Sequence, residues 1–132
     1  MKVKAISIRQ PWAWLITNGF KTVENRTRRW HYTGRLFIHA SGTFTHADRH
    51  ACEIFCGGIG FDWRQIPDIL PTGGIVGSVD LINCVEGVWP GDDWSTGPYS
   101  LVLQSPSQLI PFYRCKGRLG IFTINVPAKV AA

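Results

Sequence analysis

The order of the apolar segments constrains the fold of this chain more than any other feature. Strand-like segments follow one another at residues 3–8, 20–26, 35–41, 74–88, 100–104 and 118–126, and only residues 11–19 and 44–56 have a helical pattern. Parallel βαβ folds need regular alternation of strands and helices, which is missing here. The sequence predicts an α+β domain, a small, mostly antiparallel β-barrel of about five or six strands with flanking helices, as a single domain over residues 1–132.

Three further segments are expected to connect these elements. Residues 57–74 are rich in glycine and proline and read as a long connection, and residues 26–34 read as a polar, basic loop. Residues 109–117, which contain Pro111, are expected to form a kinked edge or a turn.

Charge is distributed unevenly along the chain. The net charge is +5, with +7 over residues 1–50, −6 over residues 51–113 and +4 over residues 114–132. If the two ends meet in the fold, they form one basic face, which would favour an anionic partner.

Cysteine usage and hydropathy point to a protein of the cytoplasm. The four cysteines do not resemble the disulfide framework of a small secreted domain. The first residues lack a signal-peptide pattern, and no run approaches the roughly 18 apolar residues of a membrane span. We therefore expect a soluble, cytoplasmic protein without membrane association.

Metal and cofactor chemistry find little support in the motifs. On a helix with about 100° per residue, His46 and His50 face away from Cys52 and Cys56, so the four cannot converge on one tetrahedral ion. Nucleophile elbows, phosphate-binding loops and dinucleotide fingerprints are also missing. We expect no metal site and no cofactor.

The segment KTVENR, residues 21–26, poses the main functional question. In a regular strand Glu24 and Arg26 share a face, whereas Lys21 points the other way unless a bulge or the preceding turn re-aims it. A lysine beside both would lose its proton more easily and could act as a base or nucleophile. The alternative is a solvated strand edge.

Basic and aromatic residues cluster after this segment and again near the C-terminus. Cations beside flat rings suit single-stranded nucleic acid, because phosphates meet the cations and bases stack on the rings. A charge run on a merely solvated face remains the alternative. The candidate nucleic-acid-binding residues, including two acceptors for base amines, are Lys21, Glu24, Arg26, Arg28, Arg29, Trp30, Tyr32, Asp80, Lys116 and Arg118.

The chain also resembles a known family, the ASCH domain, named after its homology to activating signal cointegrator-1. The resemblance rests on Gln10-Pro11-Trp12-Ala13, followed by Gly19, Lys21, Glu24 and Arg26, and on Gly34 opening a strand that ends in Ala40-Ser41. Residues 73–85 resemble the family's G-x-x-x-G strand with its acidic residue, here Asp80, and residues 97–109 and 115–124 resemble its closing strands.

This resemblance implies a fold similar to the pseudouridine-synthase and archaeosine-transglycosylase RNA-binding domain (PUA-like), with a cleft lined by residues 19–26. It implies a role connected with RNA, and some relatives are hydrolases that cleave RNA or deacylate N4-acylcytidine. The acylcytidine branch pairs its lysine with a threonine three residues later, and this chain has Glu24 there. The match is closer to the cointegrator-type branch.

The sequence thus predicts a module that binds RNA or single-stranded nucleic acid, or a nucleotide-like small molecule. The second hypothesis is a hydrolase acting on RNA or a modified nucleoside, of ribonuclease or acylcytidine amidohydrolase type, with Lys21 and Glu24 as catalytic residues. A third is a protein-interaction module that uses exposed aromatic residues, namely Trp14, Trp63, Trp89 and Trp94.

Overall fold

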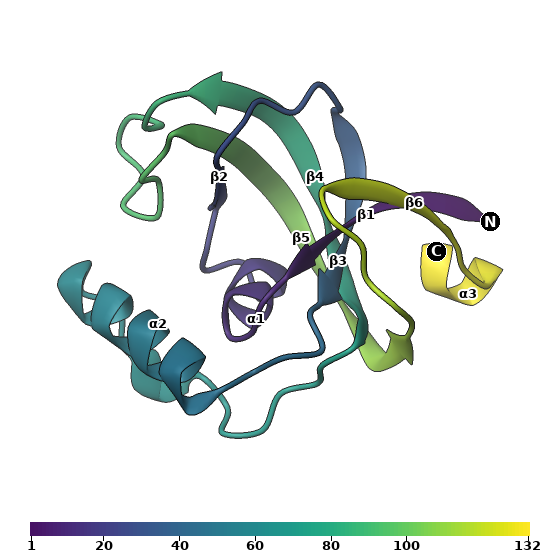
Figure 1. Cartoon of the computed structure of the whole chain (residues 1–132), viewed down its shortest axis with the longest axis horizontal. Coiled ribbons are helices and arrows are strands. Elements are labelled where there is room, and N and C mark those ends of the chain that lie inside the picture. Colours follow the sequence, from purple (N-terminus) through teal and green to yellow (C-terminus); the bar gives the residue numbers. More distant parts are fainter.

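A single six-stranded sheet forms the body of the molecule. The computed structural model describes all residues, 1–132, and its sheet has the order β2-β5-β4-β3-β1-β6. The strands are β1 (Lys2–Ile8), β2 (Val23–Arg26), β3 (Gly34–Ala40), β4 (Gly74–Glu86), β5 (Tyr99–Arg114) and β6 (Ile121–Asn125). All neighbouring pairs are antiparallel except β1 and β3. The sheet curls into a half-barrel whose edge strands, β2 and β6, do not pair (Figure 1).

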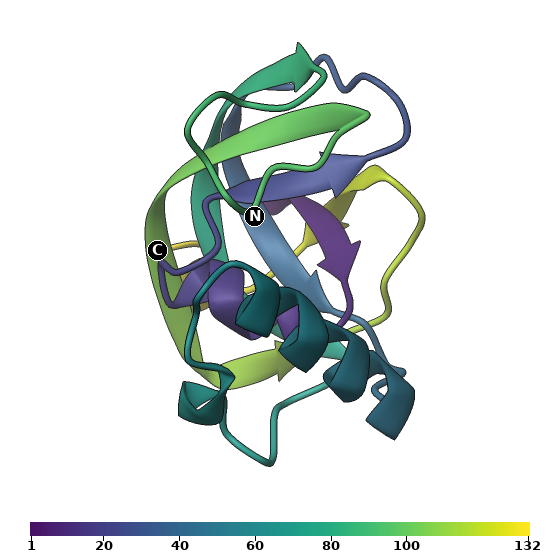
Figure 2. The same cartoon turned by 90° about the vertical axis from the view of Figure 1, so that its left-hand side faces the viewer.

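Helices cover this sheet on both faces. Helix α1 (Trp12–Thr17) packs inside the curve against β3, β4 and β5, as Figure 1 shows. Helix α2 (His46–Gly58) lies in front of α1 in the view of Figure 2 and is followed by a 3-10 turn (Trp63–Gln65). The short helix α3 (Ala128–Ala131) packs on the outer face. The α+β fold class predicted from the sequence is confirmed, with a half-barrel in place of a closed barrel.

Strand alternation explains how one sheet builds two cores. Ile6 and Ile8 of β1 face the inner core together with α1, while Ala5 faces an outer core with Phe37 and Phe122. A third apolar cluster joins α2 to α1 and β2, because Cys52 and Cys56 pack against Leu15, Val23 and Trp94. Side chains of alternating direction on each strand therefore bury both faces of the sheet.

The structure corrects three of the expected elements. Strand β2 begins at Val23, because residues 20–22 still belong to the turn that follows α1. Residues 109–114 are not an edge or a turn but the last third of β5, which pairs with β4 through several register shifts. These shifts let the ladder continue past Pro111. A third helix, α3, forms beyond residue 126, where no element was expected.

Close contact between β4 and β5 gives a prediction for stability. A Cβ atom added at Gly77 would lie 2.1 Å from the Ser107 carbonyl oxygen, whereas one added at Gly57 of α2 would meet no atom within 4 Å. We expect Gly77→Ala to lower the free energy of unfolding by about 1–3 kcal/mol. Gly57→Ala, the matched control, should raise it by roughly 0.5–1 kcal/mol, because alanine favours helix. Urea unfolding of both variants checks this pair, and equal effects would contradict it.

No helix of the structure is both long and apolar enough to span a membrane.

Candidate functional site

The open side of the half-barrel carries a cleft of about 500 Å³. Its walls come from the end of β1, from β2 and from the loop that precedes β6, so it lies between the two ends of the curled sheet. We call it the seam cleft. Its lining residues are Ser7, Ile8, Arg9, Trp12, Glu24, Asn25, Arg26, Thr27, Ser41, Arg118, Leu119 and Gly120.

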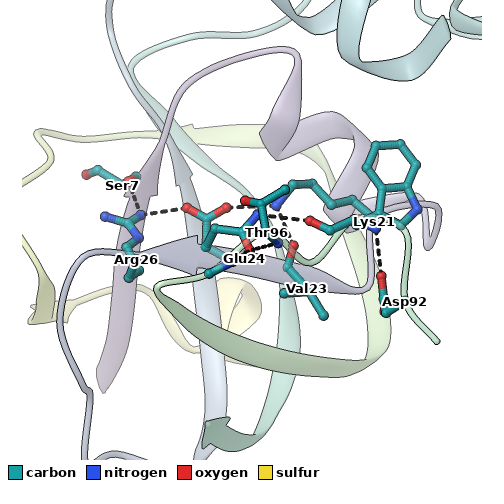
Figure 3. A network of polar contacts seen from close by, with 10 residues as sticks. Ser7, Lys21, Val23, Glu24, Arg26, Asp92 and Thr96 are labelled. Carbon is teal, nitrogen blue, oxygen red and sulfur yellow. Dashed lines mark hydrogen bonds and ion pairs between the residues drawn. The ribbon is translucent and has the colours of Figure 1, made fainter. Parts of the chain in front are cut away.

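Three charged residues form a row beside the seam cleft, of which Glu24 and Arg26 line the cleft and Lys21 does not. Glu24 Oε1 accepts from Lys21 Nζ at 2.9 Å, and Glu24 Oε2 forms an ion pair with Arg26 Nη2 at 3.0 Å. Lys21 Nζ also donates to the Val23 carbonyl, and Arg26 donates to the Ser7 carbonyl at 3.1 Å. Figure 3 shows this row, with Ser7 at one end and Lys21 towards the other. The row ties β2 to β1, which do not pair directly.

The turn after α1 explains why Lys21 reaches Glu24. Gly19 has φ of +82°, a conformation suited to glycine, and the amides of Phe20 and Lys21 both donate to the Leu15 carbonyl at 2.9 Å. Because Lys21 lies before the first residue of β2, strand alternation does not direct its side chain. The side chain turns inward and is only 4% exposed.

Arg26 holds an unused hydrogen-bond donor. Its Nε is buried and has no partner, and Nη2 forms both printed contacts, the ion pair with Glu24 and the hydrogen bond to the Ser7 carbonyl. These contacts leave Nη1 without a protein acceptor, in a residue that lines the cleft. The side chains of Arg9 and Arg118 line the same cleft. The site can therefore receive an anion.

The two basic segments of the chain, residues 1–50 and 114–132, meet in the fold, which was the condition for a common basic face. Strand β1 pairs with β6, and this pairing brings the loop with Arg118 opposite Arg9 and Arg26. Trp30 covers Gly120 of this loop, because a Cβ there would lie 2.6 Å from the indole. The Arg28 guanidinium lies 4.7 Å from the centroid of the Trp30 ring. Arg28 and Trp30 thus flank the seam cleft without lining it.

Several predicted binding residues lie elsewhere. The Arg29 guanidinium donates to the Cys84 carbonyl at 3.1 Å and lies over the Tyr99 ring. The Tyr32 hydroxyl donates to the Arg35 carbonyl at 2.6 Å, and Asp80 pairs with the Arg35 guanidinium at 3.1 Å. These three side chains are committed to internal contacts away from the seam cleft. Lys116 is exposed and does not line the cleft.

The structure adds residues that sequence patterns did not single out for binding. Trp12, assigned to the core, is half-buried and lines the seam cleft, with Lys21 Nζ 5.8 Å from its ring centroid. Arg9 lines it too and pairs with Asp48 at 3.0 Å. In the sequence, the sign that Arg9 belongs to the site is its position directly before the Gln10-Pro11-Trp12 motif. The Gln10 side chain itself is buried and accepts from the Trp14 amide at 2.9 Å, which caps the start of α1.

The other candidate sites have structural roles. Cys52 and Cys56 point from α2 into the protein core, and burial raises the pKa of both thiols. The side chains of His46 and His50 are exposed. Burial also raises the pKa of the Cys115 thiol. These three thiols therefore stay protonated at neutral pH, which makes them poor nucleophiles.

The tryptophans proposed as exposed contacts for a protein partner are mostly covered. Trp94 is buried, and only Trp63 is clearly exposed.

Comparison with known proteins identifies the family and the fold. A family model described as ASCH domain matches residues 6–99. The human and mouse proteins named activating signal cointegrator 1 are each 25% identical over 128 residues, covering 91% of this chain but only 22% of their own length. Two crystal structures of ZmASCH mutant proteins from Zymomonas mobilis superpose with a TM-score of 0.52. They share 17% and 18% identity, over 84% of this chain and 74% and 72% of theirs, and show the same fold.

Proposed function

Since the chain belongs to the ASCH domain family, we propose that it binds RNA or another single-stranded nucleic acid through the seam cleft. The observation that carries this proposal is the convergence of three arginines, Arg9, Arg26 and Arg118, on one cleft. A guanidinium whose direction is fixed by Glu24 is prepared to hold a phosphate oxygen, and charge-assisted hydrogen bonds of this kind are strong.

The cleft also offers a flat surface for a base. The Trp12 ring lies in the wall beside Glu24, so a base stacked there has a carboxylate close to it. Stacking on an aromatic side chain contributes about 1–3 kcal/mol per base and tolerates all sequences. We assign Arg9, Arg26 and Arg118 to phosphates and Trp12 to stacking, with Arg28 and Trp30 at the margin.

Binding is favoured over catalysis by the surroundings of Lys21. Its Nζ donates to Glu24 and to the Val23 carbonyl, and its side chain is 4% exposed. An ammonium group held in this way orders the cleft wall but has little reach towards a ligand. In the alternative function, hydrolysis of RNA or a modified nucleoside, Lys21 would have to leave both acceptors. We therefore rank hydrolysis with Lys21 and Glu24 as catalytic residues second.

Salt dependence tests the proposal. Three phosphates neutralised on a single strand release about 0.7 counterion each, so the slope of log affinity against log salt should be near −2. We expect the affinity for a fluorescein-labelled single-stranded RNA of mixed sequence to fall roughly 20-fold between about 50 and about 200 mM salt. Fluorescence anisotropy measures this fall. An affinity that stays flat over that range would overturn the proposal.

A further inference from the structure

We propose that Ser7 is a nucleophile for acyl transfer, with His39 as its general base, at the β1 wall of the seam cleft. Ser7 Oγ lies 3.0 Å from His39 Nδ1, and His39 Nε2 lies 2.8 Å from the Cys115 carbonyl oxygen. A nucleophile, a base and a group that orients the base are the three parts of a catalytic triad, here with a backbone carbonyl as the orienting group. This activity is separate from nucleic-acid binding and does not depend on it.

The hydrogen bonds determine where the protons are. A carbonyl oxygen can only accept, so His39 Nε2 carries the hydrogen that bonds to Cys115. In the neutral ring, Nδ1 then keeps its lone pair and faces the Ser7 hydroxyl, which donates to it. The imidazole is thus in the tautomer that can remove the hydroxyl proton.

Rigid elements hold the pair in place. Ser7 and His39 are direct partners in the parallel register of β1 and β3, so their side chains leave the same face of the sheet. The His39 ring is 2% exposed and packs edge-on against Phe122. The amide of Cys115 donates to the Gly73 carbonyl at 3.1 Å, which fixes the carbonyl that orients the ring. Catalytic groups on paired strands need little reorganisation.

Ser7 lies at the border of the seam cleft. The residue is half-buried and lines the cleft, while its hydroxyl turns with His39 towards the outer face of the sheet, where His39 packs on Phe122. Gly117 passes over the pair: a Cβ at position 117 would lie 2.2 Å from Ser7 Oγ and 2.7 Å from the His39 ring, so a substrate reaches the hydroxyl only past this loop. Arg26 donates to the Ser7 carbonyl at 3.1 Å and so holds the backbone of the nucleophile.

The chemistry that fits is hydrolysis of a carboxylic ester that carries a negative charge. The Ser7 oxygen attacks the ester carbonyl carbon while its proton moves to His39 Nδ1. The bond from that carbon to the leaving oxygen then breaks, and the leaving oxygen takes the proton from His39. Water repeats the sequence on the acyl-serine and returns the free hydroxyl, so no further reactant is needed. Arg9, Arg26 and Arg118 of the cleft favour an anionic substrate.

A fluorophosphonate reagent tests the nucleophile. Attack by Ser7 forms an Oγ–P bond and releases fluoride, and intact-mass and peptide mass spectrometry locate the adduct. We expect one adduct on wild-type protein, at Ser7, and none at that position in Ser7→Ala. His39→Gln retains a donor for the Cys115 carbonyl but lacks the base, so its labelling should be about 100-fold slower or more. Ser107→Ala, an exposed serine of β5, should label like wild type.

Three results would overturn the proposal: folded wild-type protein that forms no adduct at Ser7, an adduct on another residue in its place, or equal labelling rates for wild type and a folded His39→Gln. Circular dichroism reports the fold of each variant. The first two results are measured on wild-type protein alone, so they can overturn the proposal even if a variant fails to fold. Loss of RNA binding with retained labelling would reject the binding function alone.

Discussion

Replacing Glu24 with glutamine is expected to lower the free energy of unfolding by about 2–3 kcal/mol, because it leaves the buried ammonium of Lys21 without a carboxylate. Lys21 is 4% exposed and Glu24 is 13% exposed, so water screens their ion pair weakly. The amide can still accept one hydrogen bond, and Lys21 still donates to the Val23 carbonyl. The loss should therefore be smaller than for a fully abandoned charge. The midpoint of urea unfolding measures it.

A second glutamate provides the matched control. Glu86 is 76% exposed and lies 4.0 Å from the Arg29 guanidinium, an ion pair that water screens. Glu86→Gln makes the same chemical change and should alter stability by no more than about 0.5 kcal/mol. If Glu24→Gln proved as harmless as Glu86→Gln, the charged row of the seam cleft would have no structural role.

Removal of two cleft guanidinium groups together, by Arg26→Met and Arg118→Ala, is expected to weaken binding of single-stranded RNA on the order of 100-fold. Each charge-assisted hydrogen bond to a phosphate contributes about 1.5 kcal/mol or more, and two such losses add to about 3 kcal/mol. The salt slope should fall in parallel, since fewer counterions are released. Anisotropy titrations at one low salt concentration and one moderate concentration measure both changes.

The control for this variant removes the same charge elsewhere. Arg64→Ala with Lys129→Ala loses two positive charges from exposed residues that do not line the seam cleft. We expect its affinity to fall only a few-fold, through the weaker overall field. Arg118→Ala alone is informative too, because Arg118 is exposed and forms no hydrogen bond or ion pair within the protein that its loss would break. Equal affinities for the two double variants would place the nucleic-acid site outside the cleft.

Sequence patterns were sufficient for the fold class because they depend on local rules. Period-two alternation places Ile6 and Ile8 on one face of β1, and the capping residue Thr45 marks the start of α2, where it accepts from the Asp48 amide. Lys21, Glu24 and Arg26 were also found locally, since they are near neighbours in the chain. Their contact with one another needed one further element, the turn at Gly19.

Contacts between segments far apart in the chain could not be predicted from such local patterns. Residues 109–114 contain a proline and resemble a turn, yet they form the end of β5 because β4 offers a long partner strand. Arg29 and Tyr32 resemble binding residues by composition, but in the fold one Arg29 donor and the Tyr32 hydroxyl bond to internal carbonyls. Whether a side chain faces a ligand or its own protein depends on which strands pair, and pairing is a property of the whole chain.

The sequence by itself determined the alternation of apolar residues, the basic ends and the cluster around Lys21, all of which depend on spacings of a few residues. The tertiary structure alone decided that β1 and β6 bring the basic ends together, that Trp12 lines a cleft, and that Ser7 meets His39. The physical reason is separation along the chain. Ser7 and His39 are partners only through the parallel register of β1 and β3, which the burial of both sheet faces selects.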